Sequence, residues 1–261
     1  MKTVLITGAC VNTGVAIVEK FAKEGSRVVF TGRDQNKVEG ALKSYKEKFP
    51  SVEILGYAIN SLIDQRTVDE KAIDDMFKDL DDKGVTVDCL VLNAADQGLN
   101  MKIFENPLTD FMSVINTNVT WNYALIERAS LRMKNNGGGS IVFINSNTAY
   151  RAIPDRIAYE TSKGAQLGMM RGLALDLGKY NIRVNAVLPG MIKTDRWIKN
   201  PDFYKDVPSR FTPIGDVAVG EDVAEAVWYF AYGAKNTTGA ELVVDGGNSI
   251  QLYPIIPKEQ K

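Results

Sequence analysis

Short apolar runs alternate with amphipathic stretches along the first third of the chain. Each apolar run is rich in β-branched residues and ends in a turn residue, as buried strands do, and each amphipathic stretch repeats its apolar positions with helical spacing. The first helix shows the pattern with Val15, Val18 and Phe21 before Gly25 ends it. The expected strands are 2–7, 27–31 and 52–58, and the expected helices are 13–24, 34–48 and 66–83.

The alternation continues to the end of the chain. Further strands are expected at 87–92, 140–145, 182–187 and 241–244, and further helices at 108–134, 158–177 and 221–232. This βαβ order predicts an α/β fold with a parallel sheet covered by helices on both faces. Right-handed crossovers would bring the ends of the first, fourth, fifth and sixth strands to one edge.

One domain spanning 1–261 is the expected organisation, because no repeat, low-complexity tract or linker interrupts the pattern. Residues 195–214 have mixed polarity and include three prolines. This composition favours a substrate lid, placed at about 191–215, and a C-terminal tail follows at about 248–261.

Composition narrows the chemistry available to the protein. The 261 residues are 45% hydrophobic and 24% charged, with a formal net charge of −1, so neither nucleic acid nor a membrane surface is an expected partner. Histidine is absent and only two cysteines occur, which excludes a Ser-His-Asp triad and makes a metal site unexpected. Acid/base chemistry would therefore fall to Tyr, Lys, Asp or Glu.

The composition also bears on location. Two cysteines are too few for a disulfide framework and suit a reducing compartment. No apolar stretch of about 18 residues predicts a membrane span, and the N-terminal run is interrupted by glycine too early for a signal peptide. We therefore expect a cytoplasmic protein.

The turn Thr7-Gly8-Ala9-Cys10-Val11-Asn12-Thr13-Gly14 joins the first strand to the first helix. Glycine permits a tight turn and lets the backbone approach a pyrophosphate at the positive end of a helix. Asn12 is the non-glycine residue that best tolerates left-handed backbone. The turn predicts a phosphate site, although a strand-to-helix glycine without a ligand is the alternative.

A second constellation consists of Ser146, which follows the fifth expected strand, and of Tyr159 and Lys163, four residues apart on a helix. That spacing puts the phenol and the ammonium on one face. An unperturbed phenol has a pKa near ~10, so acid/base work near neutrality needs a pKa lower by roughly 3, or about 4 kcal/mol of stabilisation of the phenolate. A neighbouring cation supplies part of that stabilisation. The Tyr-Lys pair alone also fits a core tyrosine beside a surface lysine.

Taken together, these segments resemble the short-chain dehydrogenase/reductase family over nearly the whole chain. The turn resembles the family's Thr-Gly-x-x-x-Gly-x-Gly, with Asn12 replacing the middle glycine. Asn93-Ala94-Ala95 resembles Asn-Ala-Gly, with Ala95 replacing the glycine. The other matching segments are Ser146, Tyr159 and Lys163, the stretch 182–190, Thr238-Gly239 and residues 244–247. The resemblance implies a doubly wound Rossmann fold of roughly 250 residues, with seven parallel strands in the order 3-2-1-4-5-6-7.

The resemblance also implies roles for the candidate catalytic residues. Tyr159 would be the general acid in carbonyl reduction and the general base in alcohol oxidation. Lys163 would lower the pKa of Tyr159 and bind the nicotinamide ribose, and Ser146 would position the substrate oxygen. Asn118 would hold a water in the proton relay, with Asn116 as a rival by spacing.

A nicotinamide cofactor follows from the same resemblance. At the end of the second strand, where an acid would bind an adenosine ribose, the chain has Gly32 followed by Arg33. An arginine fork suits a phosphate, so NADP(H) is expected over NAD(H). Asp34 lies next to Arg33 and weakens this expectation, and the alternative is that Arg33 is only a solvated surface residue. The other expected cofactor-binding residues are Gly8, Asn12, Thr13, Gly14, Asn60, Ser61, Asn93, Ala94, Tyr159, Lys163, Pro189, Gly190, Ile192 and Thr194.

The resemblance implies a small carbonyl compound or alcohol as substrate, and the aromatic residues of the expected lid suggest a hydrophobic, steroid-like one. Simple packing of the lid explains those aromatics equally well. Candidate substrate contacts are Asp96, Asn147, Tyr150 and Trp197. Apolar residues in the tail 250–256 predict a subunit contact, as in a homodimer or homotetramer.

Two other functions stay open on the residues. One is a non-redox enzyme of the same fold, such as an epimerase or a dehydratase. The other is a protein that senses NADP(H) without turnover. The full set of Asn118, Ser146, Tyr159 and Lys163 argues against the sensor, which has no need of a tuned phenol.

Overall fold

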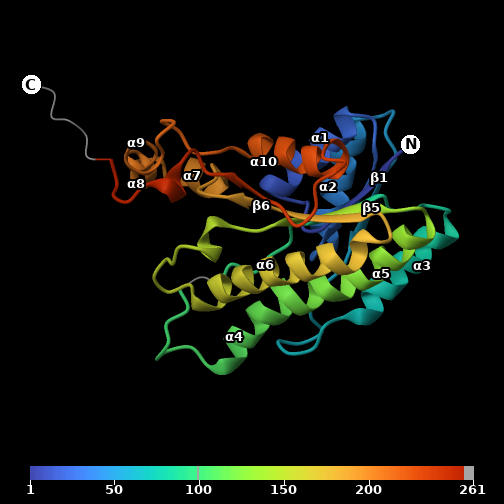
Figure 1. Cartoon of the computed structure of the whole chain (residues 1–261), viewed down its shortest axis with the longest axis horizontal. Helices are drawn as coiled ribbons and strands as arrows, with labels where there is room; N and C mark the ends of the chain where they lie inside the picture. Colours follow the sequence, from blue (N-terminus) through green and yellow to red (C-terminus); the bar gives the residue numbers. More distant parts are fainter. Residues whose placement is uncertain (99, 256–261) are drawn as a thin grey trace, which may run out of the picture.

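A parallel sheet of seven strands forms the centre of the computed structural model, which describes residues 1–98 and 100–255 apart from the side chain of Phe203 (Figure 1). The strand order is β3-β2-β1-β4-β5-β6-β7, and each neighbouring pair is parallel, as predicted. The strands are β1 Thr3–Ile6, β2 Arg27–Gly32, β3 Ile54–Ala58, β4 Cys89–Leu92, β5 Gly139–Ile144, β6 Ile182–Pro189 and β7 Glu241–Val244.

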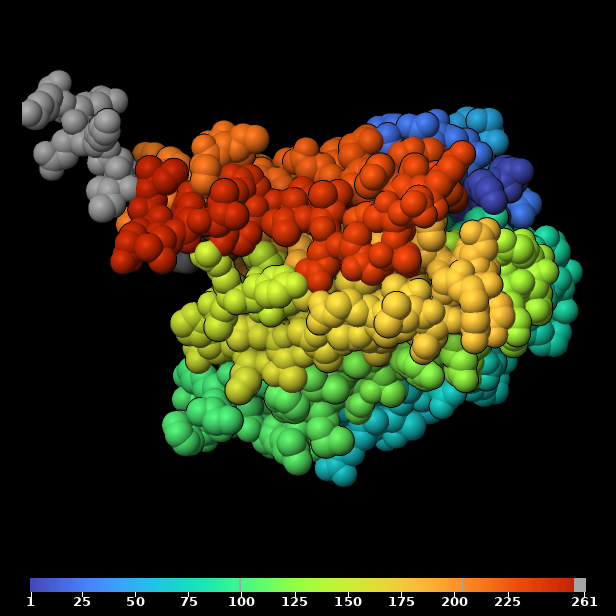
Figure 2. All heavy atoms as spheres, viewed as in Figure 1, coloured from blue at the N-terminus to red at the C-terminus, as the bar shows by residue number. Residues whose placement is uncertain are grey.

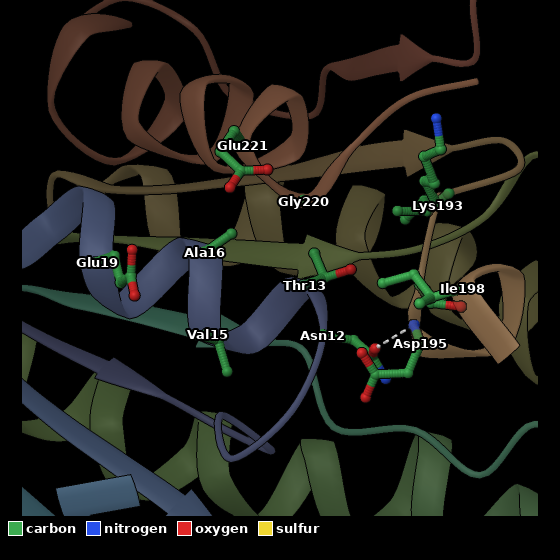
Figure 3. A pocket seen from close by; sticks show the side chains of 12 residues that line it. Asn12, Thr13, Val15, Ala16, Glu19, Lys193, Asp195, Ile198, Gly220 and Glu221 are labelled. Carbon is green, nitrogen blue, oxygen red and sulfur yellow. Dashed lines mark hydrogen bonds between the residues drawn. The ribbon is translucent and has the colours of Figure 1, made fainter. Parts of the chain in front are cut away.

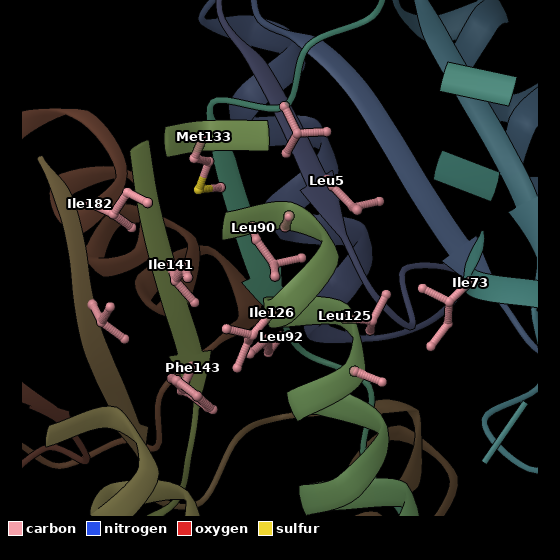
Figure 4. Packing of buried hydrophobic residues seen from close by; sticks show 14 of the residues in the cluster. Leu5, Ile73, Leu90, Leu92, Leu125, Ile126, Met133, Ile141, Phe143 and Ile182 are labelled. Carbon is pink, nitrogen blue, oxygen red and sulfur yellow. The ribbon is translucent and has the colours of Figure 1, made fainter. Parts of the chain in front are cut away.

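Helices cover both faces of this sheet, and each face has its own apolar core. One core joins the sheet to α3 (Glu70–Asp82), α5 (Trp121–Asn135) and α6 (Ile157–Gly178), and Figure 4 shows Ile73 and Leu125 packed in it. The other joins it to α1 (Thr13–Lys23), α2 (Gln35–Lys48) and α10 (Gly220–Trp228). The two cores explain why the central strands β1 and β4 are apolar: both of their faces are buried.

Three expected helices differ from the sequence prediction. The one expected over 221–232 is α10 followed by a π turn, η3 (Tyr229–Gly233). The helix expected from residue 66 begins at Glu70, because Asp64 accepts the backbone N–H groups of Arg66 and Thr67 in a turn, and Asp69 caps the helix through Ala72. The helix expected over 108–134 is α4 (Leu108–Ile115) and α5, joined by a single π turn, η1 (Asn116–Thr120). A π turn re-aims the side chains it carries and is frequent at functional sites.

The lid segment contains three short helices, α7 (Asp195–Lys199), α8 (Pro201–Tyr204) and α9 (Val207–Phe211). Segments near residues 150 and 250, far apart in sequence, lie side by side in Figure 2, where Arg151 Nη1 donates to the Gln251 carbonyl at 2.8 Å. In the tail, Ile250, Leu252 and Tyr253 are exposed. Residues 256–261, which complete the expected tail, lie outside the described residues.

Candidate active site

The turn after β1 is built so that only glycine fits at two places. Gly8 has φ +65°, and a Cβ there would lie 2.8 Å from the Ala94 Cα. A Cβ on Gly14 would lie 2.6 Å from the Gly8 carbonyl oxygen. Asn93 Nδ2 donates to the carbonyls of Thr7 and Gly8, both at 3.0 Å, and so fixes the turn against the end of β4. The turn stands at the N-terminus of α1, where a bound anion is favoured.

Asn12 adopts positive φ (+49°), as predicted for a residue in a glycine position. Its Oδ1 accepts a hydrogen bond from the Asp195 backbone N–H at 3.2 Å, which links the turn to the start of α7 (Figure 3). Thr13 begins α1 and lines the same pocket as Ile192 and Thr194. The turn, the first residues of α1 and the segment after β6 therefore enclose one pocket.

The end of β2 has little room for an acid. A Cβ on Gly32 would lie 2.5 Å from the Cys10 Sγ and 2.8 Å from the Val38 Cγ2, so a side chain enters only if the thiol moves. Arg33 is exposed and makes no ion pair within the described residues. An unpaired guanidinium beside a glycine suits a 2′-phosphate better than a bare ribose.

Asn60 and Ser61 differ in how they could meet an adenine. Asn60 is exposed, whereas the Ser61 hydroxyl is buried and lies 3.2 Å from the Thr117 Oγ1. Of the two, Asn60 has the free side chain, and Ser61 ties the end of β3 to η1.

The three predicted catalytic residues meet where β5 ends. Ser146 follows β5, and Tyr159 and Lys163 lie in the first turns of α6. Lys163 is 2% exposed; its Nζ donates to the Ile144 carbonyl at 2.8 Å and lies 5.4 Å from the centroid of the Tyr159 ring. The Ser146 hydroxyl accepts the Thr148 N–H at 3.2 Å and lies near enough to the Tyr159 phenol to lower its pKa. The serine, phenol and amine thus form one group, as the spacing predicted.

Burial shifts the pKa values of Tyr159 and Lys163 in opposite directions. Burial raises the pKa of Tyr159, and the hydrogen bond with Ser146 and the positive charge of Arg156 only partly oppose that effect. Burial also lowers the pKa of Lys163, to about 7. Lys163 is not among the causes of the Tyr159 shift, so its expected effect on the phenol stays a prediction.

Asn118 lies fully buried in η1, and its side chain is bonded to the chain around it. Its Oδ1 accepts from the Asp96 N–H at 2.7 Å, and its Nδ2 donates to the Asp96 carbonyl at 2.8 Å and to the Ser162 Oγ at 2.9 Å. Asn116, the rival, donates instead to the Arg66 carbonyl at 2.8 Å. The π turn therefore directs Asn118 to the site and Asn116 away from it.

At the end of β6, Pro189 and Gly190 pass close to the chain after β7. A Cβ on Gly190 would lie 2.5 Å from the Asp245 Cβ, and its N–H donates to the Val244 carbonyl at 3.0 Å. Ile192 forms a short parallel bridge with Ala218, which sets the course of the segment toward α7. The close packing at Gly190 keeps the segment in place over the expected cofactor site.

The four candidate substrate residues differ in what their side chains contact. Asp96 accepts the Gly98 N–H at 2.9 Å, and Asn147 donates to the Asn248 Oδ1 at 3.1 Å, so both stabilise loops at the site. The Tyr150 hydroxyl bonds to Glu241 on the edge strand β7, and the residue is 63% exposed. Trp197 stacks on Tyr204 with centroids 4.3 Å apart, so it belongs to an aromatic pair within the lid.

Two residues at the site escaped the sequence prediction. Gln166 is 1% exposed and accepts from Lys163 Nζ at 3.2 Å. Its position three residues after Lys163, on the same helical face, was the available signal. Arg156 precedes α6, donates to the Gln97 carbonyl at 3.0 Å and acts electrostatically on Tyr159. No helix in the described ranges is long and apolar enough to cross a membrane, and no metal-binding cluster of three or more Cys, Asp or Glu occurs there.

Comparison with known proteins agrees with this geometry. A family model described as enoyl-(acyl carrier protein) reductase matches residues 8–249. A 3α-hydroxysteroid dehydrogenase of Mediterraneibacter gnavus is 32% identical, with 94% of this chain and 96% of that protein covered. An NADP-dependent (R)-specific alcohol dehydrogenase of Lentilactobacillus kefiri is 31% identical, with 96% and 97% covered. The crystal structure of L-sorbose reductase from Gluconobacter frateurii, complexed with NADPH and L-sorbose, superimposes with a TM-score of 0.85 at 30% identity, covering 96% and 97%.

The chain belongs to the short-chain dehydrogenase/reductase family. It is an NAD(P)-dependent oxidoreductase that acts on CH–OH groups and the corresponding carbonyls.

Proposed function

We propose that the protein interconverts a ketone and a secondary alcohol, with Tyr159 as general acid and base and NADP(H) as the preferred cofactor. The observation that carries the proposal is the contact of Ser146, Tyr159 and Lys163 at the end of β5. A bound nicotinamide supplies or accepts the hydride. Tyr159 gives its phenolic proton to the substrate oxygen in reduction and takes it back in oxidation, while the Ser146 hydroxyl orients that oxygen.

The cofactor would lie along the carboxyl edge of the sheet. Gly8, Asn12, Thr13 and Gly14 would hold the pyrophosphate, with Asn93 and Ala94 beneath it. Arg33 would pair with the 2′-phosphate, and Asn60 would meet the adenine, near Ser61. Lys163 would bond to the nicotinamide ribose, and Pro189, Gly190, Ile192 and Thr194 would cover the carboxamide. Relatives whose names include NADP or NADPH support this preference.

The proposed substrate is a hydrophobic carbonyl compound or alcohol. The stacked Trp197 and Tyr204 would offer an apolar surface to such a substrate, and one relative is a hydroxysteroid dehydrogenase. Relatives acting on a sugar or on an acyl carrier protein make these the competing classes. The exposed tail residues Leu252 and Tyr253 support assembly as a homodimer or homotetramer of single-domain subunits in the cytoplasm.

Absorbance at the reduced-nicotinamide band tests the proposal. The protein is mixed with NADPH or NADH and a panel of steroid ketones, simple ketones, ketoses and acyl thioesters. We expect NADPH oxidation with at least one hydrophobic ketone, and none with the Tyr159→Phe variant. An epimerase or dehydratase would convert substrate without net change in that band, which mass spectrometry of the products would reveal.

A further inference from the structure

The buried amide of Gln166 lies between two residues of the proposed catalytic set. Its Oε1 accepts from Lys163 Nζ and from Asn145 Nδ2, both at 3.2 Å, and its Nε2 donates to the Asn118 carbonyl at 2.7 Å. Three polar contacts on a side chain only 1% exposed make this amide part of a fixed network.

Asn118 does not reach Lys163 by itself. Its side chain is bonded to the Asp96 backbone and to Ser162. Its main-chain carbonyl oxygen accepts hydrogen bonds from Gln166 Nε2 at 2.7 Å and from Asn122 Nδ2 at 2.8 Å. A carbonyl oxygen has two lone pairs, so these two amides fill it. In the described structure, Gln166 therefore links the Asn118 main-chain carbonyl in η1 to Lys163.

We propose that Gln166 is a positioning residue, which holds the Lys163 ammonium by accepting a hydrogen bond and ties it to the Asn118 carbonyl. The inference rests on the proposed function, because it assigns Gln166 a part in orienting Lys163 for work beside Tyr159.

The proposal rests on the small number of polar groups that surround Lys163 Nζ. Besides Gln166, its Nζ has the Ile144 carbonyl of β5, and the titratable group beside it is Tyr159 on its own helix. Burial is the cause of its lowered pKa, and no opposite charge counters it. An acceptor in such a place favours the charged form, so the Gln166 oxygen opposes the loss of the proton.

A purely structural Gln166 would only satisfy the Asn118 carbonyl and fill space. Asn122 supplies the matched control, since it is also fully buried and donates to the same carbonyl but makes no contact with Lys163. Gln166→Met and Asn122→Leu each remove one amide donor from that oxygen, and only the first removes an acceptor from Lys163.

The test is an NMR titration of the cofactor-free protein labelled with [ε-¹³C]lysine, with the Lys163 signal assigned by its absence in Lys163→Met. We expect the Lys163 midpoint to fall by about one pH unit in Gln166→Met, the size of one hydrogen bond to a charged group, and to stay unchanged in Asn122→Leu. Gln166→Glu, which keeps the shape and adds a carboxylate, should raise the midpoint and serves if Gln166→Met does not fold.

The proposal is overturned if the Lys163 midpoint is unchanged in Gln166→Met, or if it shifts equally in Asn122→Leu. If Gln166→Met does not fold, an unchanged Lys163 midpoint in Gln166→Glu overturns it. Because the titration needs neither cofactor nor turnover, a failure of this proposal can be distinguished from a failure of the proposed function. In the active enzyme, Gln166→Met should move the alkaline limb of the pH profile of kcat to lower pH, because Lys163 would lose its charge earlier; a stability defect alone would leave that limb in place.

Discussion

The α6 face that carries Lys163 and the lid that carries Trp197 differ in how far their side chains are buried and hydrogen-bonded. Lys163 and Gln166 are at most 2% exposed, and each is held by more than one hydrogen bond. In the lid, Arg196 and Ile198 are exposed, and Trp197 and Tyr204 stack as a pair. The difference teaches that the proposed proton chemistry would rest on a buried polar network, while the proposed substrate contacts lie in a segment with more exposed side chains.

Tyr159→Phe should break the catalytic side of this comparison most severely. It removes only the transferable proton, so kcat should fall by about 10²–10⁴-fold. Binding of NADPH, followed by quenching of tryptophan fluorescence, should change little because the ring is retained. Substantial activity in this variant would show that another group supplies the proton.

Arg33→Ala should give the next largest effect, and it separates cofactor choice from the chemistry. Loss of the guanidinium that would pair with the 2′-phosphate should weaken NADPH binding by about 10- to 100-fold, while NADH binding serves as the internal control. Isothermal titration with both cofactors measures this. Equal losses for the two cofactors would mean that Arg33 is only a solvated residue.

The sequence predicted the sheet and the grouping of Ser146, Tyr159 and Lys163 at the end of β5 because both follow local rules. Apolar strands, a glycine turn and a spacing of four on a helix each have one physical interpretation once they occur together. The π turn was not predictable, since Asn116 and Asn118 are both polar residues in a helical pattern and only packing decides which one faces the site. The opposed pKa shifts of Tyr159 and Lys163 depend on burial, which the spacing of residues does not determine.

Trp197→Ala should sharpen the lid side of the comparison. Loss of the stacked pair with Tyr204 should raise KM for a hydrophobic substrate about three- to tenfold and leave kcat almost unchanged. Lys199→Ala, on the same short helix and exposed, is the control. Steady-state kinetics decide: a fall in kcat comparable to that of Tyr159→Phe would place Trp197 with the chemistry.

Arg156→Ala should have the smallest effect, a shift of the pH profile, and it tests whether the two regions are electrically coupled. The Arg156 cation lowers the pKa of Tyr159, so its removal should raise that pKa further. Alcohol oxidation needs the phenolate as base; its rate therefore rises with pH, and the midpoint should move to higher pH in the variant. Arg151→Ala, whose guanidinium bonds to the Gln251 carbonyl, is the control, and its profile should match that of the unaltered enzyme. Equal profiles for all three proteins would mean that Arg156 only anchors the loop at Gln97.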